Sequence, residues 1–336
     1  MADKELIPPG LNYLADNITS KHNILGASRG EGAKWAKGLN LPEKAETIFF
    51  AGCGYQYASE LESLMSLIRR IDKSAIGAET AMNLANFQKK LGFDAAGIYR
   101  RVMSKDRDDD AAALKDAIKV LKHLGVEVGY LADNEPCCGG LLYYMGLHKE
   151  FGQNARQLTD GMKSSGVKRI ISIIPSCTNA LRKLIPDSIG GSDIEVKHFC
   201  EVVLEKIDSL ELRYPRNVKV AYHDPCQLSR YMKLVDEPRR ILRAIKGIEL
   251  VETKFTNGDC TTCCGGGGGF EAVFPELSQI LAVNRAKELL DTGAEIIITQ
   301  CPGCIMQLKE GVKELKETKV EVLDLAQILA TAMGLS

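Results

Sequence analysis

An internal repeat is the feature that most constrains how this chain can fold. Three landmarks occur twice, in the same order, and each contains cysteine. They are a strand-like run that ends in a cysteine (Cys53 and Cys226), a double cysteine before glycine (Cys137–Cys138 and Cys263–Cys264), and an apolar run that ends in a cysteine (Cys177 and Cys301). The second copy lies 126 residues behind the first at the double cysteine and 124 behind it at the third landmark. This near-constant offset predicts a duplicated unit.

The N-terminal copy is longer than the C-terminal copy. The first cysteines of the two copies are 173 residues apart, so about 47 extra residues stand between Cys53 and Cys137. Two runs in this stretch, LESLMSLIRRI and AALKDAIKVLKHLG, carry apolar residues at three- and four-residue spacing, which is typical of amphipathic helices. We therefore expect a helical insertion in the N-terminal copy.

Near-continuous apolar runs alternate with amphipathic patterns along most of the chain. This alternation is typical of parallel sheets that helices cover on both faces. We expect an α/β protein of two tandem, pseudo-symmetric domains, each a small, mostly parallel sheet flanked by helices. The expected parts are an N-terminal extension (1–45, with the lone Trp35), a first domain (46–211), a linker near Leu212–Lys219 and a second domain (216–336). Ligands gather at the carboxyl ends of strands in such sheets, which is where these cysteines fall.

The charge of the chain is balanced and mixed. There are 43 basic and 44 acidic residues, with a formal net charge of -1, so no electrostatic footprint for nucleic acid or an anionic membrane appears. The N-terminus MADKELIPPG lacks a signal-peptide pattern, and no 18-residue apolar run follows, so we expect no membrane insertion by this chain and a cytoplasmic location. The cytoplasm keeps thiols reduced, which makes metal binding the leading explanation for eleven cysteines.

The cysteines of the C-terminal copy are the most specific signal in the sequence. Thirty-six residues separate Cys226 from Cys263, and two separate Cys301 from Cys304. Zinc and a cubane [4Fe-4S] cluster each take four ligands, and this set offers five. Because neighbouring side chains diverge, the adjacent Cys263 and Cys264 more easily reach two irons than chelate one.

The pattern C-x36-CCG-x35-C-x2-C, with the runs HDPCQLSRY, DEPRRIL, CCGGGGG and TQCPGC, resembles the cysteine-rich CCG domain of B- and D-type subunits of heterodisulfide reductases and their relatives. The resemblance covers both halves, from about residue 46 to the end. It implies a non-cubane [4Fe-4S] cluster in the second domain. The ligands carried over by the resemblance are Cys226, Cys263, Cys264, Cys301 and Cys304.

The N-terminal copy departs from this pattern. Its matching cysteines are Cys53, Cys137, Cys138 and Cys177, and Ala180 stands three residues after the last of them, where the resemblance expects a fifth. A second full non-cubane cluster is therefore not expected. Four thiolates can hold a conventional iron–sulfur cluster or zinc, and we expect an occupied site with iron–sulfur ahead of zinc.

The two remaining cysteines are not expected to be ligands. Cys260 has no counterpart in the other copy, so it is interpreted as a loop thiol. Cys200 aligns with Ala326 on an expected helix and is interpreted as a core residue. The glycine run Gly265–Gly269 lacks the Lys-Ser/Thr of a phosphate loop. We expect it to pack closely against the cluster instead.

Three polar residues near the C-terminal cysteines have open roles. His223, three residues before Cys226, is a candidate to donate a proton or bind substrate, with a structural hydrogen bond as the alternative. Arg239 and Arg240 are candidates to bind an anionic substrate, with a helix-surface role as the default.

The expected function is that of an oxidoreductase subunit that reduces a disulfide, a thiol-type substrate or another acceptor at the C-terminal cluster. The alternative is a non-catalytic electron relay in a larger flavin and iron–sulfur complex, such as a benzoyl-CoA reductase or hydroxy-acid oxidation complex. A zinc scaffold is the third interpretation. Because the chain lacks a ferredoxin-type C-x2-C-x2-C-x3-C-P run, its electrons must come from another chain. The expected partners are a ferredoxin-like iron–sulfur subunit and a flavoprotein subunit.

Overall fold

The computed structural model describes residues 7–28, 30–72 and 111–335. The expected helical insertion is partly visible in it. LESLMSLIRRI lies in α3 (Ala58–Asp72), and AALKDAIKVLKHLG supplies α6 (Ala112–His123). The rest of the expected insertion, residues 73–110, lies outside the described residues.

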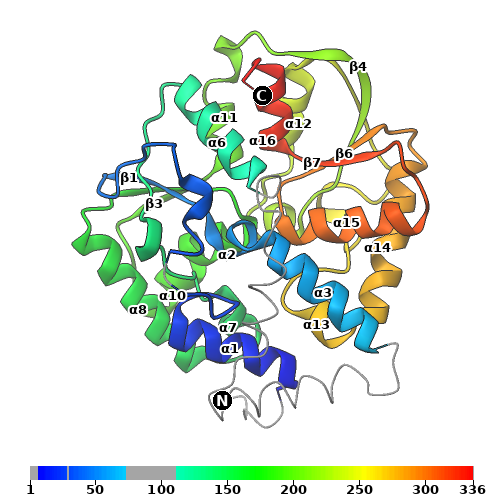
Figure 1. Cartoon of the computed structure of the whole chain (residues 1–336). Helices are drawn as coiled ribbons and strands as arrows, with labels where there is room; N and C mark the ends of the chain where they lie inside the picture. Colours follow the sequence, from blue (N-terminus) through cyan, green and yellow to red (C-terminus); the bar gives the residue numbers. More distant parts are fainter. Residues whose placement is uncertain (1–6, 29, 73–110, 336) are drawn as a thin grey trace.

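Two parallel sheets confirm the predicted fold class (Figure 1). The first has the order β1-β2-β3, with β1 at Thr47–Phe50, β2 at Arg169–Ser172 and β3 at Glu195–His198. The second has the order β5-β4-β6-β7, with β4 at Arg213–Tyr222, β5 at Lys246–Val251, β6 at Ile296–Thr299 and β7 at Glu321–Asp324. An isolated parallel bridge from Gly129 to Ile48 stands beside β1 as β5 stands beside β4. The two sheets therefore share one topology, as expected of a duplication.

Helices cover both sheets, and their order repeats as well. The N-terminal half contains α1 (Pro9–Lys21), η2 (Lys34–Ala36), α2 (Gly52–Gln56), α3, α6, η3 (Ala132–Asn134), α7 (Gly140–Tyr144), α8 (His148–Ser164), α9 (Pro175–Asn179), η4 (Ala180–Leu184), α10 (Ile185–Ile189), α11 (Phe199–Leu204) and η5 (Ile207–Ser209). The C-terminal half contains η6 (Gln227–Tyr231), α12 (Asp236–Ala244), η7 (Gly258–Cys260), α13 (Phe270–Val273), α14 (Pro275–Leu290), α15 (Pro302–Glu314) and α16 (Leu325–Ala332).

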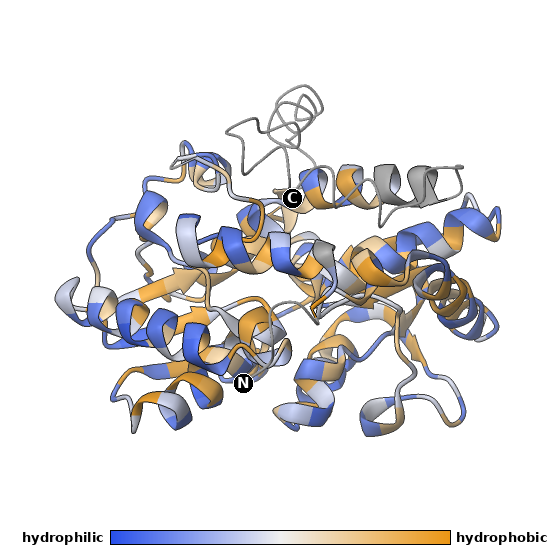
Figure 2. Cartoon of the chain, turned by 90° about the horizontal axis from the view of Figure 1, so that it is seen from below, coloured by the Kyte–Doolittle hydropathy of each residue, from blue (hydrophilic) through white to orange (hydrophobic). Residues whose placement is uncertain are grey.

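The two halves pack together through matching pairs of helices. The helix that follows β3, α11, packs on α12 of the other half, and the helix that follows β7, α16, packs on α6. One continuous apolar core therefore includes residues of both sheets. Figure 2 shows the apolar strands inside and the polar faces of the helices outside. Because α6 and α12 occupy equivalent places, α6 belongs to the repeat, and the expectation that AALKDAIKVLKHLG is part of the insertion is wrong. The extra N-terminal residues lie between α2 and α6.

The N-terminal extension is part of the first core. Trp35 is buried, donates from Nε1 to the Tyr130 hydroxyl at 3.0 Å and meets the Phe49 ring edge-on at 5.9 Å. Ile18 of α1 is fully buried as well. The extension thus covers the β1 side of the first sheet.

The prediction of a linker at Leu212–Lys219 is wrong. Strand β4 begins at Arg213, and Lys246 N–H donates to Leu212 C=O at 2.9 Å. The first five residues of β4 are mostly exposed, and the pairing with β5 is irregular between Arg213 and Val218. This exposed, charged strand end has the composition of a linker, which is why the sequence pattern misleads.

No helix among the residues that the structure describes combines the length and the apolar character needed to cross a bilayer.

Candidate metal centre

The five C-terminal cysteines follow the carboxyl ends of neighbouring strands. Cys226 comes shortly after β4, while Cys301 is the N-cap of α15 after β6 and Cys304 lies in its first turn. Cys263 and Cys264 come from the loop between η7 and α13. The Sγ atoms of Cys264 and Cys304 are 3.1 Å apart. Parallel strands thus bring together residues that are 78 positions apart in the chain, from Cys226 to Cys304.

This site is buried on one side and open on the other. Cys264 and Cys304 are buried, Cys226 and Cys301 are half-buried, and Cys263 is exposed. Hydrogen bonds from Cys263 and Cys304 hold the pKa of the Cys264 thiol well below its usual value. The Gly265 N–H also donates to Cys263 Sγ at 3.3 Å. Metals bind the thiolate form, and Cys264 is the thiol that reaches this form most easily, because its hydrogen bonds raise the pKa of Cys263 and Cys304 while burial raises the pKa of Cys226.

The four N-terminal cysteines form a matching but closed site. Cys53, in α2 just after β1, is buried together with Cys137, Cys138 and Cys177. The Sγ atoms of Cys138 and Cys177 are 3.3 Å apart, and Gly139 N–H donates to Cys137 Sγ at 3.4 Å. Hydrogen bonds from Cys137 and Cys177 hold the pKa of Cys138 well below its usual value. The second cysteine of each pair is therefore the favoured thiolate in both halves.

The strand register corrects the alignment of the third landmark. Arg169 of β2 pairs with Glu195, and the equivalent pair in the second sheet is Ile296 with Glu321. This offset of 127 residues, and not 124, makes Cys177 the counterpart of Cys304. The Sγ contacts agree, because Cys138 meets Cys177 as Cys264 meets Cys304. The N-terminal counterpart of Cys301 is consequently Ile174.

The helix starts and the glycine environments give the same correction. Ile174 and Cys301 are both N-caps with a proline at the next position. A Cβ built on Gly140 would meet Ala180 and the Ser176 carbonyl, whereas one on Gly266 would meet Gln307 and the Gly303 carbonyl. The expectation that Ala180 replaces the fifth cysteine is therefore wrong, since Ala180 is the counterpart of Gln307. Sequence spacing misplaces it because two cysteines, Cys301 and Cys304, follow β6 within five residues, and spacing alone pairs Cys177 with the first of them.

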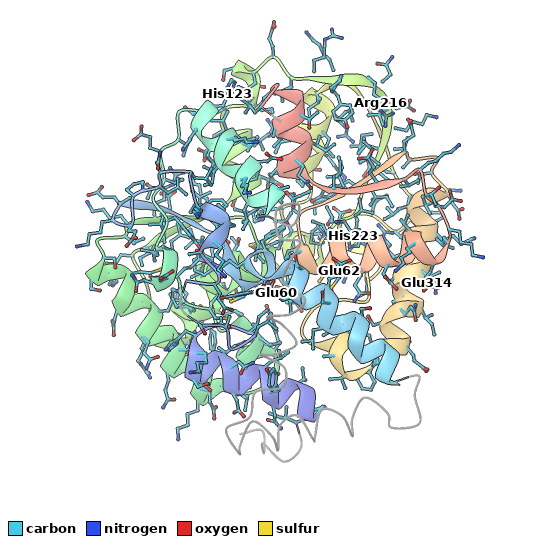
Figure 3. All side chains as sticks on the ribbon, viewed as in Figure 1. Glu60, Glu62, His123, Arg216, His223 and Glu314 are labelled. Carbon is cyan, nitrogen blue, oxygen red and sulfur yellow. The ribbon has the colours of Figure 1, made fainter. Side chains whose placement is uncertain are left out.

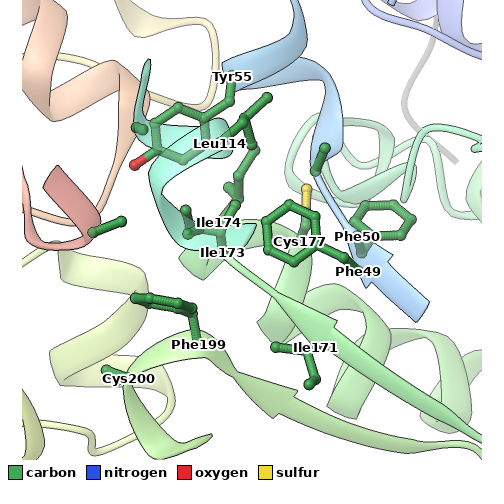
Figure 4. Packing of buried hydrophobic residues seen from close by; sticks show 14 of the residues in the cluster. Phe49, Phe50, Tyr55, Leu114, Ile171, Ile173, Ile174, Cys177, Phe199 and Cys200 are labelled. Carbon is green, nitrogen blue, oxygen red and sulfur yellow. The ribbon is translucent and has the colours of Figure 1, made fainter. Parts of the chain in front are cut away.

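Ile174 fills the fifth position with an apolar side chain. It is 3% exposed, and a Cβ built on Gly52 would lie 2.6 Å from Ile174 Cδ1 and 3.0 Å from Cys177 Sγ. Gly52 also has φ +69°. Glycine is therefore required here both for this backbone conformation and for the short distance to Ile174 and Cys177. Figure 4 shows Ile174 and Cys177 within the same buried cluster.

Part of the glycine run lies close to the helices beside the C-terminal cysteines, and its packing against a cluster stays a prediction. Gly265 has φ +85°, and a Cβ there would lie 2.3 Å from the Ser278 carbonyl oxygen. Gly303, between the last two cysteines, would place a Cβ 4.0 Å from Gly267 N. The run therefore brings backbone close to the α15 turn that carries Cys304.

His223 is buried beside the C-terminal thiols rather than open to a substrate. It is 1% exposed, and it lies toward the middle of the molecule in Figure 3. A ring nitrogen of His223 lies within 4.8 Å of Cys264 Sγ and Cys304 Sγ. Its Nδ1 accepts from Arg285 Nε at 3.0 Å. The alternative of a structural hydrogen bond describes this arrangement better than substrate binding does.

The sequence did not predict Arg285. Its side chain is fully buried on α14, on the face that also carries Ser278, Ala282 and Leu289. A basic residue at a core position of an amphipathic helix is the signal that could have revealed it, since a fully buried arginine needs partners.

The two arginines of DEPRRIL have different surroundings. Arg239 is buried and makes a two-pronged ion pair with Asp224, at 2.7 and 2.8 Å, and its Nε donates to Glu252 at 2.7 Å. This pair fixes the loop between β4 and Cys226. Arg240 is exposed on α12.

The remaining cysteines lie as interpreted from the sequence. Cys200 is fully buried in the core at the start of α11, with its Sγ 3.1 Å from His198 Nδ1. Cys260 is exposed in the η7 turn.

A protein-family model matches both halves of the chain. The family described as "Cysteine-rich domain" (CCG) matches residues 103–182 and 220–309, which together are more than half of the chain. The chain belongs to the CCG family. Both CCG matches contain a double cysteine and the cysteine after the next strand, whereas Cys53 precedes the first match.

Proteins similar to this CCG chain include named redox enzymes. One is a D-type subunit of the dihydromethanophenazine:CoB–CoM heterodisulfide reductase of Methanosarcina barkeri, 31% identical over 65% of this chain and 54% of that protein. Another is the EtfAB:quinone oxidoreductase of Syntrophomonas wolfei, 33% identical over 64% of this chain and 31% of that protein. A third is the probable iron-sulfur-binding oxidoreductase FadF of Bacillus subtilis, 31% identical over 64% and 30%. The chain thus spans between about a third and about half of the length of these oxidoreductase relatives.

The residues of the C-terminal CCG domain fit an iron–sulfur cluster. The donor set consists of thiolates, which such clusters take as ligands. In addition, Arg285 Nη2 and both polar side-chain atoms of Gln307 are buried without a hydrogen-bond partner among the described residues. Gln307 lies one turn after Cys304, and its Cγ would be 2.8 Å from a Cβ built on Gly266. Unpaired buried polar atoms are costly, and cluster sulfides would accept hydrogens from Arg285 Nη2 and Gln307 Nε2.

The two CCG sites face each other across the contact between the halves. Helix α2, which carries Cys53, packs on α15, which carries Cys304. At this contact, the Tyr55 hydroxyl donates to the buried carboxylate of Asp324. On the other side, Asn179 Nδ2 donates to the Gln227 side chain at 3.1 Å, next to Cys226. The duplication therefore brings the elements that carry the two sets of thiols into contact.

Proposed function

We propose that this CCG protein is an oxidoreductase subunit that carries an iron–sulfur cluster on Cys226, Cys263, Cys264, Cys301 and Cys304 and passes electrons to an acceptor there. When bound, the cluster supplies one-electron transfer and an iron that a sulfur atom can approach. The observation that carries the proposal is the convergence of five thiols, one more than zinc or a cubane needs, on a site that opens to the surface.

The exposure pattern supports a disulfide or thiol-type acceptor. Cys263 is exposed and Cys226 and Cys301 are half-buried, so the acceptor would approach on the side where these three residues lie. Cys264 and Cys304 are buried on the opposite side of the site. The relative named as a heterodisulfide reductase makes a disulfide the first acceptor to try.

The closed N-terminal site supports electron supply to this centre. Its four buried cysteines suit a cluster that exchanges electrons without binding a substrate, and zinc is the other occupant that four thiolates accept. We propose that the electrons come from a ferredoxin-like iron–sulfur subunit and a flavoprotein subunit in a cytoplasmic complex. The partial coverage of the relatives agrees with functions that are distributed over several domains or chains.

A relay role is the second candidate. The similarity to a protein named EtfAB:quinone oxidoreductase favours it, because that name describes electron transfer between proteins and a quinone. In this case the open C-terminal site would meet a partner protein and no small acceptor.

One experiment separates the two candidates. The protein is purified anaerobically, and electron paramagnetic resonance spectra are recorded before and after addition of a small disulfide or thiol. We expect a single oxidised-cluster signal to change in the wild type and in Cys260→Ser, and no such signal in Cys301→Ser. If thiols and disulfides change no spectrum in the assembled complex, while Cys301→Ser stops electron transfer between the partners, the relay role stands instead.

A further inference from the structure

A buried arginine holds His223 in one orientation beside the C-terminal thiols. The Arg285 side chain has no exposed surface, and its Nε donates to His223 Nδ1 at 3.0 Å. Its Nη1 donates to Glu288 at 2.8 Å and to the hydroxyls of Thr256 and Thr262 at 3.1 and 3.3 Å. These partners fix the guanidinium, so the direction of the hydrogen bond to the ring is fixed as well.

The chemistry of arginine decides which ring nitrogen carries the proton. A guanidinium has donors and no acceptor, so His223 Nδ1 must hold a lone pair. The ring proton of the neutral imidazole is then on Nε2, and Nε2–H is the donor that remains for the thiols. His223 lies within 4.8 Å of Cys264 Sγ and Cys304 Sγ.

We infer that Arg285 and His223 are positioning residues of the C-terminal centre, which direct an N–H donor to Cys264 Sγ and make this centre the easier of the two to reduce. The inference rests on the proposed function, because it concerns the iron–sulfur cluster on these thiols. A hydrogen bond to a ligand sulfur offsets part of the negative charge that reduction adds, and this raises the reduction potential. Nε2–H stays on the ring, so no proton transfer is involved, and a protonated Nε2 is not a metal ligand.

The N-terminal half has no equivalent of this donor at the matching strand position. The strand registers pair Thr47 with Arg169 and Val220 with Ile296, which makes Phe50 the counterpart of His223. Phe50 is fully buried and has no polar hydrogen to donate to a sulfur. The difference favours electron flow from the N-terminal site toward the open C-terminal site.

The test is a redox titration of the anaerobically purified full chain, followed by electron paramagnetic resonance. His223→Leu removes the ring donor, Arg285→Met removes the group that orients it, and His223→Gln keeps an N–H near the position of Nε2. We expect the midpoint potential of the C-terminal cluster to fall in the first two variants and to stay near the wild-type value in His223→Gln. Iron content should match the wild type in all three. A merely structural role of His223 would not distinguish glutamine from leucine in this way.

Two outcomes overturn the inference. One is an iron-loaded His223→Leu protein with an unchanged potential. If His223→Leu does not retain iron, Arg285→Met decides, because it leaves the ring in place, and an unchanged potential in that variant overturns the inference. A wild-type protein without iron contradicts the proposed function itself, which makes the two failures distinguishable.

Discussion

The two cysteine sites are built on equivalent strands and helices but differ in burial and in the residue at the fifth ligand position. In the N-terminal half all four cysteines of the site are buried, and Ile174 fills the place of a fifth ligand. In the C-terminal half Cys301 stands at that place and Cys263 is exposed. The same strands and helix starts thus produce a closed site and an open one. One residue, at the N-cap of the helix that follows β2 or β6, accounts for the difference in ligand number: it is Ile174 in the first half and Cys301 in the second.

The largest expected effect comes from removing the cysteine that distinguishes the sites. Cys301→Ser should abolish the paramagnetic signal of the C-terminal centre and lower the iron content, because the five-thiolate set is broken. Cys53→Ser should change the metal content of the N-terminal site and leave the C-terminal signal in place. Cys260→Ser, which alters an exposed thiol outside both sets, is the control. Loss of both signals in either ligand variant would show that the sites are not independent.

Restoring the fifth position should convert the closed site. Ile174→Cys places a thiol where the C-terminal half has Cys301, so we expect a change in the spectrum and in the iron content of the N-terminal site. The loss of the buried side chain should lower stability by about 1–3 kcal/mol. Ala180→Cys is the matched control, since its counterpart is Gln307. A spectral change in Ala180→Cys and none in Ile174→Cys would contradict the structural alignment.

The loops that present the first cysteines are anchored differently. In the C-terminal half Asp224 binds Arg239, whereas in the N-terminal half Glu135 accepts from the Ala51 and Gly52 N–H groups at 2.9 and 2.7 Å. Arg239→Met leaves the Asp224 carboxylate buried and without its ion-pair partner, so we expect a loss of about 3–5 kcal/mol in the free energy of unfolding.

Arg243→Met is the control for that substitution. Arg243 is on the same helix and approaches Glu252 at 3.4 Å, but its side chain is 58% exposed. We expect a change of about 0.5 kcal/mol or less. Chemical denaturation of both variants measures the two changes in the free energy of unfolding. Equal changes would mean that the buried Arg239–Asp224 ion pair has no special role.

The two helix caps that repeat across the halves should depend on pH in opposite directions. His198 caps α11 and Asp324 caps α16, each within a capping box. Burial lowers the pKa of His198 to about 3 and raises the pKa of Asp324 to about 7. The stability linked to His198 is present above its unfolded pKa, near 6.5, and is lost as the pH falls toward 3. The stability linked to Asp324 is present below about pH 4 and is lost as the pH rises through 7.

The opposite pH dependences of the stability linked to His198 and Asp324 can be measured as shifts in the thermal midpoint between about pH 4 and pH 8. Asp324→Asn keeps a capping oxygen and should flatten the decline on the alkaline side, by up to about 1.4 kcal/mol per pH unit. His198→Asn should flatten the decline on the acidic side. A variant with the pH profile of the wild type would show that the cap in question does not titrate in this range.

The repeat and the cysteine sets could be predicted because the cysteines stand at the ends of apolar strands, where parallel sheets collect their ligands. The identity of the missing fifth position could not. Counting residues between cysteines misplaced it at Ala180, because Cys177 can be aligned with either Cys301 or Cys304. The backbone pairing of β2 with β3 placed it at Ile174. The start of β4 was missed for a different reason, since its exposed, charged end has the composition of a loop.

Long-range polar contacts were also beyond the reach of the sequence pattern. Arg285 meets His223 from a helix 62 residues away, and no local motif records such a pairing. The same holds for Tyr55 and Asp324, which join the two halves. Burial of a charged residue in an otherwise apolar stripe is a sign that a partner exists, but it does not say which residue the partner is.

The metal content of the anaerobically purified wild-type chain tests the central claim most directly. Iron and zinc are determined on the same sample, and the iron environment is examined by Mössbauer spectroscopy. We expect a brown protein with about four irons in the C-terminal domain, bound by the five thiolates that converge there. Iron below about one per chain together with stoichiometric zinc would contradict the account.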